Sequence, residues 1–442
     1  MNRIKTLLVK LTIPLIVLLC TWHSANIHWG KQWNCIITSD GKGYYSYLPA
    51  VFIYHDLNFG FYDTIENKYY DEHLKSDYRA GNGEKTTIDK YFCGVSILQL
   101  PFFLGGHAAA KISGVEMDGY SKPYAIALNI GTIFWLMIGL IYLRKLLISF
   151  GAGRVKASLV LLTFVFGTNL FFYTIGEPAM SHVYSFALVS IFLVYSKKWI
   201  DTFKNKYLLL TFLLLGLITV VRPVNLLIVL WIPFAAGSLQ ASLSALKALF
   251  SKPTFLLLAI FLFLLPVSFQ LIIYKLSIGS FFVDAYGAER FYFNKPEVIN
   301  FLFSYKKGLF VYTPLIFLSL FGLIPLWKQN RFRAIWIFCS LFFIVYVLSC
   351  WWMWYYGGSF GMRAMIEFFP VFALLYYFLI DGIKIKSIRI GIISLSFIFV
   401  LLCQFQTMQY RYEIIHWSEM TKDSYWHAFL NADFLAKKIH KY

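Results

Sequence analysis

Long runs of apolar residues alternate with short polar segments along most of the chain. Most of these runs are close to the about 20 residues that a helix needs to cross about 30 Å of hydrocarbon. The pattern predicts about eleven membrane-spanning helices, at residues 7–27, 123–147, 155–175, 179–197, 206–221, 224–237, 254–276, 308–327, 332–350, 364–381 and 388–409. We therefore expect an all-α polytopic membrane protein in which residues 1–442 form a single transmembrane domain.

Composition agrees with this class, because 59% of the residues are hydrophobic and only 14% are charged. No hydrophilic block is long enough to form a separate soluble domain. The apolar run at 7–27 is not followed by a small-residue cleavage site, so we expect a retained span rather than a signal peptide.

Two apolar stretches leave the topology open. Residues 94–110 are short and are interrupted by Pro101 and by the pair Gly105 and Gly106. Residues 206–237 fit either one long span or two short ones hinged at the Arg222-Pro223 step.

The distribution of charge decides between these options. If the N-terminus is cytoplasmic, 94–110 is re-entrant or interfacial, and 206–237 is a hairpin, every short inner loop is basic. The inner segments then hold about half of the 40 Lys and Arg residues, but of the acids only Asp201 and Asp381. We therefore expect a multi-pass protein of the inner (plasma) membrane, with the C-terminus outside. The net charge of +18 reflects the excess of basic residues in the inner segments. We therefore do not attribute it to nucleic-acid binding and expect no nucleic acid partner.

The expected outer face carries the segments with chemical variety. They are a large first extracytoplasmic loop at 28–122, a second loop at 278–307 and a C-terminal tail at 410–442, with two shorter segments at 176–182 and 351–363. The inner loops are short and basic. If the protein catalyses a reaction, we expect it on the outer face.

Six cysteines do not form a recognisable metal motif. Four lie in or beside predicted spans. Cys35 and Cys93 share the first outer loop, where a disulfide and free thiols both remain open.

The chain also lacks the common nucleotide-binding motifs. It contains no P-loop, no G-x-G-x-x-G and no D-x-D pair. A cytosolic activated substrate is therefore disfavoured, and we expect any substrate to arrive through the lipid or from the outer compartment.

Three short stretches resemble the GT-C superfamily of integral-membrane glycosyltransferases. They are residues 39–49 (SDGKGYYSYLP), residues 90–104 (KYFCGVSILQLPFFL) and residues 352–363 (WMWYYGGSFGMR). The likeness is greatest to uncharacterised bacterial members near the aminoarabinose- and mannosyl-transferase types. It implies a GT-C-like fold whose large first loop carries short amphipathic helices. It also implies transfer of a sugar, a hexose or pentose, from a polyprenyl-phosphate donor to a lipid, glycan or protein of the cell envelope.

The resemblance also suggests catalytic residues. The carboxylate that the family carries after its first span maps onto Asp40, and Glu177 occupies the place of a second acid in the next outer loop. The Asp-Glu pair of protein O-mannosyltransferases is absent, so the acceptor stays unassigned. The expected partners are the lipid-linked sugar donor and membrane lipids.

The chemistry of such a transfer needs a base and positive charge. A hydroxyl that attacks an anomeric carbon must lose its proton, which a carboxylate accepts, and we expect Asp40 to be this general base. The departing phosphate needs nearby cations. The candidate substrate-binding residues are Arg363, Arg290, Lys307, Arg222, Tyr44, Tyr45, His182 and Trp354.

Some of these residues have simpler interpretations. Arg222 lies at membrane depth, where a cation needs a partner or a wet cavity, and of these alternatives and snorkelling to the outer interface we favour snorkelling. A lone histidine such as His182 is more often a hydrogen-bonded structural group than a ligand. No cofactor is certain, and a divalent cation is a candidate with Asp40 and Asp56 as its candidate ligands.

Two other classes remain open from the sequence. A transporter or a flippase of lipid-linked saccharide is also polytopic, but it places polar groups in broken helices near the midplane, and only the Arg222-Pro223 step has that character. A non-catalytic membrane assembly protein is the third alternative.

Overall fold

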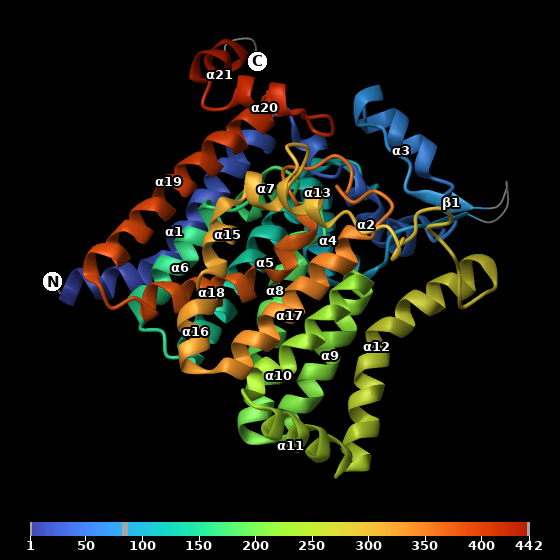
Figure 1. The fold of residues 1–442 in the computed structure, drawn as a ribbon. Coiled ribbons are helices and arrows are strands. Elements are labelled where there is room, and N and C mark those ends of the chain that lie inside the picture. The colour runs from blue at the N-terminus through green and yellow to red at the C-terminus, as the bar shows by residue number, and fades with distance from the viewer. Residues whose placement is uncertain (1, 82–86, 440–442) are drawn as a thin grey trace.

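The computed structural model describes residues 2–81 and 87–439, most of which are helical (Figure 1). The first half of the chain forms α1 (Asn2–His28), α2 (Asp40–Pro49), α3 (Tyr62–Tyr69), α4 (Gly94–Ser113), α5 (Lys122–Ser149), α6 (Arg154–Phe166), α7 (Leu170–Ile175), α8 (His182–Thr202) and α9 (Asn205–Val221). The second half forms α10 (Trp231–Ala236), α11 (Leu239–Phe250), α12 (Pro253–Ile278), α13 (Val298–Phe303), α14 (Leu309–Tyr312), α15 (Pro314–Leu320), α16 (Leu323–Gln329), α17 (Arg331–Ser349), α18 (Phe369–Gly382), α19 (Lys386–Arg411), α20 (Lys422–Ala428) and α21 (Ala432–Ile439).

Short 3-10 and π-helical turns and two strands complete the fold. The turns are η1 (Trp33–Cys35), η2 (Ala50–Tyr54), η3 (Glu72–Leu74), η4 (Pro223–Leu230) and η5 (Arg363–Phe368). Strands β1 (Arg79–Gly81) and β2 (Thr87–Asp89) pair antiparallel, with Arg79 opposite Asp89.

The helices fit a multi-pass membrane protein. Eight helices within the described ranges are long and apolar enough to cross a membrane, or up to nine if the bent pair Pro223–Ala236 and Leu239–Phe250 is one span. The predicted all-α class is therefore confirmed. The predicted number of eleven is not, because α6 has only 13 residues, α9 has 17, and residues 308–327 are divided among α14, α15 and α16.

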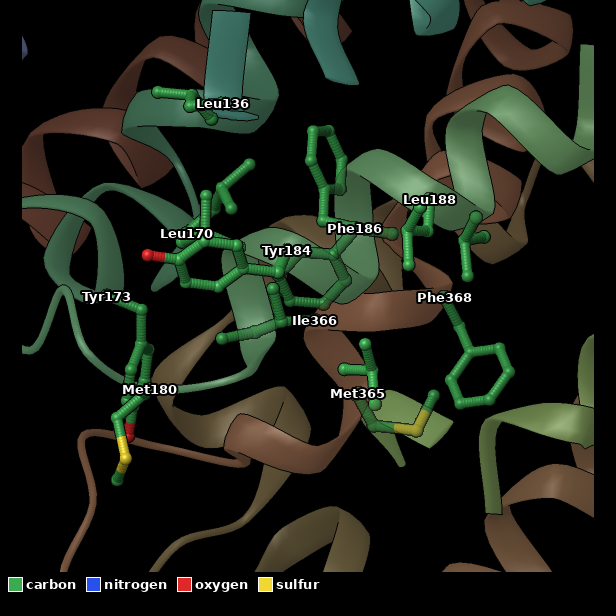
Figure 2. Packing of buried hydrophobic residues seen from close by; sticks show 14 of the residues in the cluster. Leu136, Leu170, Tyr173, Met180, Tyr184, Phe186, Leu188, Met365, Ile366 and Phe368 are labelled. Atoms are coloured by element: carbon green, nitrogen blue, oxygen red, sulfur yellow. The ribbon is translucent and has the colours of Figure 1, made fainter. Parts of the chain in front are cut away.

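The core is centred on α8 and on the segment Arg363–Gly382. In an 18-residue apolar stretch of each, 83% and 94% of the residues are buried, whereas the shares in α12 and α19 are only 17% and 11%. Figure 2 shows Phe186 and Leu188 of α8 near Phe368 of η5. Because α12 and α19 lie at the periphery with large apolar side chains exposed, we expect their outward faces to contact lipid (Figure 1).

Residues 206–237 form the predicted hairpin. The helix α9 ends at Val221, Arg222 is extended because a proline follows it, and Pro223 begins η4. The carbonyl of Gly237 then accepts a hydrogen bond from Asn330 at 2.9 Å, so the chain has returned to the end of the bundle where α9 begins. Arg222 lies at the tip of this hairpin.

The helix α4 covers residues 94–110, for which we expect a re-entrant or interfacial placement. It is among the eight segments with the length and apolarity of a span. Its first residue, Gly94, packs on the backbone of Val220 and Val221, and Gly106 packs on Tyr124 at the start of α5. It thus runs antiparallel to the first half of α5 and does not reach the end of the bundle where α5 finishes. The re-entrant or interfacial placement stays a prediction.

The two ends of the bundle carry different residues. At one end, the turns after α5, α8, α10, α16 and α18 meet, and Lys156 pairs there with Asp381. At the other end lie α2, α3, the β hairpin and α20 (Figure 1). We refer to these as the basic end and the loop end. They correspond to the expected inner and outer faces.

This correspondence predicts a labelling pattern. Cysteines introduced at Asn67 in α3 and Asp423 in α20 should react with an impermeant maleimide in intact cells, and a cysteine at Lys204 in the turn between α8 and α9 should react only after lysis. The background protein would have its six native cysteines replaced. If the cysteines at Asn67 and Asp423 were protected in intact cells and the one at Lys204 were labelled, the orientation would be the opposite of the expected one.

Candidate functional site at the Asp40 cavity

A cavity of about 570 Å³ opens at the loop end of the bundle. Its size lies within the range of small-molecule sites. It is lined by Asp40, Tyr44, Lys90, Tyr91, Phe92, Val221, Arg222, Pro223, Val224, Tyr286, Glu289, Arg290, Phe291, Trp351, Trp352, Met353, Tyr356, Gly357 and Arg363. The first loop, the hairpin tip, the second loop and the aromatic loop 351–363 therefore share one cavity.

Two glycines of the first loop fix the position of Asp40. A Cβ on Gly41 would lie 2.5 Å from the Cβ of Ala179, and a Cβ on Gly43 would lie 2.3 Å from the ring of Tyr91. Any larger residue would push α2 away from the turn before α8 or from the strand-to-helix connection before α4. The glycines thus bring the first turn of α2, which contains Asp40, against the cavity wall.

Asp40 and Arg363 form the central ion pair of the site. The Oδ2 atom of Asp40 lies 2.8 Å from Nη2 of Arg363, and Oδ1 accepts a hydrogen bond from the Tyr91 hydroxyl at 2.8 Å. The Asp40 side chain is 29% exposed and that of Arg363 is 11% exposed. Asp40 is thus the more accessible partner from the cavity.

The neighbours of Asp40 keep it ionised. Burial alone would raise the pKa of Asp40, but the Arg363 guanidinium, the Tyr91 hydroxyl and the Lys90 ammonium together outweigh it and hold the pKa below its ordinary value. In the absence of a ligand, Asp40 is therefore a stable carboxylate and a weak proton acceptor.

Arg222 belongs to a second polar cluster beside the cavity. Its Nη1 atom lies 2.7 Å from Oε1 of Glu367, and the same carboxylate oxygen lies 3.1 Å from Nδ1 of His182. The Glu367 side chain is completely buried. The expectation that Arg222 snorkels was therefore wrong, because an acid inside the bundle holds it. His182 is a hydrogen-bonded group within this cluster and does not line the cavity.

Glu177 and Lys307 lie close to Arg363 but do not line the cavity. The Oε2 atom of Glu177 is buried and has no hydrogen-bond partner among the described residues. Burial raises the pKa of Glu177 to about 7, with Arg363 acting against the shift and Asp40 with it. Burial lowers the pKa of Lys307 to about 7, although Glu177 opposes this shift. Lys307 donates to the carbonyl of Ser359.

The raised pKa of Glu177 predicts a pH-dependent stability. The folded state favours the protonated acid, so this contribution to stability is fully present below the ordinary pKa of 4.5 and is lost as the pH rises through about 7. The variant Glu177→Gln should therefore match the wild type at pH 4.5 and be the more stable protein at pH 8. Thermal unfolding in detergent at both pH values measures this. Glu419→Gln, at an exposed position, is the control. An unchanged difference between Glu177→Gln and wild type across the range would contradict the assignment.

The remaining predicted residues divide between the cavity and the surrounding packing. Tyr44 and Arg290 line the cavity, although Arg290 also pairs with the exposed Asp284 at 2.8 Å. Tyr45 faces the interior of the first loop, where its hydroxyl donates to the carbonyl of Gly119. Trp354 packs edge-on against Tyr355 and does not reach the cavity.

The two candidate metal ligands are not brought together. The carboxylate of Asp56 accepts hydrogen bonds from the backbone of Asn58 and Gly60, at 2.8 and 2.6 Å, and so stabilises a turn. The helix α2 and its continuation η2 separate it from Asp40. Across residues 2–81 and 87–439, no group of three or more His, Cys, Asp or Glu side chains gathers as a metal site. Cys35 and Cys93 are both free thiols, so no disulfide joins them.

Sequence reasoning missed Glu367 and Tyr91. Glu367 stands inside a predicted span, and an acid within an apolar run is itself a signal of a functional or paired group. Tyr91 lies in a segment that was noted only for its resemblance to a family. Its contact with Asp40 joins residues 51 positions apart, and no local pattern encodes that contact.

Comparison with known proteins does not assign the chain to a family. No protein-family model matches the chain, and a search of curated proteins finds no match. The resemblance to GT-C glycosyltransferases therefore stays a prediction from the sequence.

Proposed function

We propose that this protein is a glycosyltransferase that moves a sugar from a polyprenyl-phosphate donor to a hydroxyl of a cell-envelope acceptor, on the outer face of the membrane. The observation that carries the proposal is the ion pair of Asp40 and Arg363, 2.8 Å apart at the wall of one cavity. Glycosyl transfer from a phosphate needs a carboxylate and a cation at neighbouring points, and this pair supplies both.

The reaction assigns a role to each member of the pair. The acceptor oxygen attacks the anomeric carbon, and its proton passes to a carboxylate oxygen of Asp40. The bond between the anomeric carbon and the phosphate oxygen breaks, and its electron pair leaves with the polyprenyl phosphate. Arg363 balances the negative charge of that phosphate with two parallel N–H donors. No other co-reactant is required.

Donor binding itself would activate the base. In the empty cavity, Arg363 holds the pKa of Asp40 low. A donor phosphate that engages the guanidinium adds negative charge beside Asp40 and competes for the same cation, and both effects raise the affinity of Asp40 for a proton. The base then becomes effective only when the donor is present.

The remaining lining suits a sugar bound next to a lipid phosphate. Tyr286 and Trp351 meet edge to face at 5.8 Å, and both line the cavity with Tyr44. Aromatic rings present flat apolar faces to the C–H faces of a sugar. Lys90, which pairs with Glu289 of the second loop at 3.4 Å, and Arg222 add positive charge to the lining.

The direct test is a transfer assay with purified protein, a polyprenyl-phosphate sugar and envelope extracts as acceptor. Formation of a glycosylated product with release of polyprenyl phosphate supports the proposal. Movement of intact lipid-linked sugar across vesicles without cleavage would favour the flippase alternative, and neither activity would favour an assembly role.

Arg363 provides a specific prediction within this proposal. Arg363→Lys keeps the charge but loses the planar pair of donors. We expect donor affinity to fall about 10- to 100-fold, because a hydrogen bond to a charged group contributes about 1.5–3 kcal/mol. Binding of a fluorescent polyprenyl-phosphate sugar measures this, with Arg331→Lys at the basic end as control. Unchanged affinity in Arg363→Lys would move the phosphate role to Arg222 or Arg290.

A further inference from the structure

A second cavity, of about 300 Å³, opens at the basic end of the bundle. It is lined by Ser149, Phe150, Lys197, Leu326, Gln329, Asn330, Arg333 and Phe378. These residues come from the end of α5, the last turns of α8, the turn between α16 and α17, and α18. In Figure 1 the helices α10 and α16 mark this end, away from α2 and the first loop.

Two cations converge in this cavity. The ammonium of Lys197 lies 5.1 Å from the ring centre of Phe150, and the guanidinium carbon of Arg333 lies 5.4 Å from the same centre. Both charges therefore flank one ring. None of the residues that line the cavity is an acid.

The two cations are partly free to bind an anion. Arg333 donates to the carbonyls of Phe234 and Ala235 but forms no ion pair within the described part of the chain. Lys197 pairs with Asp201 at 2.8 Å, and the side chain of Asp201 is 48% exposed, so this acid can move away into solvent. Gln329 adds an amide to the lining, whereas the hydroxyl of Ser149 already donates to the carbonyl of Leu146 at 2.7 Å. This donor set fits the oxygens of a phosphate group.

The surroundings favour a lipid as the source of the phosphate. Ile324 and Trp327, on the same short helix as Leu326, are 58% and 47% exposed. Large apolar side chains beside a cationic pocket suit acyl chains beside a headgroup. Basic pockets between helices at the cytoplasmic side of a membrane protein are suited to anionic lipid headgroups.

We propose that this pocket binds the phosphate headgroup of an anionic phospholipid through Lys197 and Arg333. The site lies at the opposite end of the bundle from the Asp40 cavity, and its occupancy does not depend on any reaction there.

The test uses delipidated, full-length protein in detergent and measures lipid retention by native mass spectrometry together with the thermal unfolding midpoint. Phosphatidylglycerol should bind and raise the midpoint, and phosphatidylcholine of the same acyl composition should bind much more weakly. Lys197→Gln should lower the affinity for phosphatidylglycerol about fivefold, the effect of one cation near a membrane surface. Lys328→Gln, which removes a neighbouring exposed cation outside the pocket, should leave it unchanged.

A second variant tests the proposal even if Lys197→Gln fails to fold. Asp201→Asn releases Lys197 from its competing acid, so it should increase the affinity for phosphatidylglycerol. Equal binding of both lipids, an equal effect of Lys328→Gln and Lys197→Gln, or a loss of affinity in Asp201→Asn would overturn the proposal. If inorganic phosphate raises the unfolding midpoint and phosphatidylglycerol does not, the proposal that the bound phosphate belongs to a lipid is overturned.

Discussion

Replacing Asp40 with asparagine should reduce the turnover number of glycosyl transfer by about 10²–10⁴-fold, the usual contribution of a positioned general base. Asparagine keeps the size of the side chain, and its oxygen still accepts the hydrogen bond from Tyr91. It loses the charge that Arg363 faces and the capacity to take a proton. The chemical step should therefore slow while the cavity keeps its shape.

The assay must separate a chemical role from a structural one. If Asp40 acts as the base, the folded fraction of Asp40→Asn should retain donor binding, while the turnover number per folded molecule falls. Asp56→Asn is the matched control, because Asp56 lies in the same loop and only caps a turn. Near wild-type turnover in Asp40→Asn would remove the assigned role and leave Glu177 as the next base to test.

The sequence predicted both members of the central ion pair, but not that they pair. Asp40 was placed by its position after the first span, and Arg363 by its position before a late one. The two lie 323 positions apart. The structure gives the two glycines of the motif a physical role, since each permits a close contact that positions α2. The sequence does not give the distance between the two loops, because that distance depends on how the helices pack around α8.

The local sequence pattern also did not show which of Tyr44 and Tyr45 lines the cavity. Successive residues of a helix point about 100° apart, so the two adjacent tyrosines of α2 face different surroundings. Tyr44 lines it, and Tyr45 packs inside the loop. The same limit applies to the number of spans, because hydropathy measures apolarity and cannot show that residues 308–327 break into three short helices.

The charge pattern was more informative about topology than hydropathy was. Basic residues at the inner turns predicted a hairpin at 206–237, and the chain does reverse at Arg222. The prediction failed on the environment of that arginine, because snorkelling was considered without a search for an acid in another apolar run. Glu367 was that acid, and it lies 145 positions away.

The second large effect is expected from Glu367→Gln. This change leaves the Arg222 guanidinium, whose side chain is 15% exposed, without its counter-charge. Breaking a buried ion pair by removing one partner usually destabilises a protein by about 3–5 kcal/mol. We therefore expect a large fall in the thermal unfolding midpoint, together with weaker donor binding if Arg222 no longer points toward the cavity.

The exposed pair of Arg290 and Asp284 provides the comparison. Both of its side chains are more than half exposed, at 65% and 61%, and Asp284→Asn should change the free energy of unfolding by about 1 kcal/mol or less. The double variant Arg222→Met with Glu367→Met should recover much of the stability lost in Glu367→Gln, since neither charge then remains buried alone. A Glu367→Gln protein as stable as the wild type would show that Arg222 reaches solvent after all, and that its contact with Glu367 does not hold it at the cavity wall.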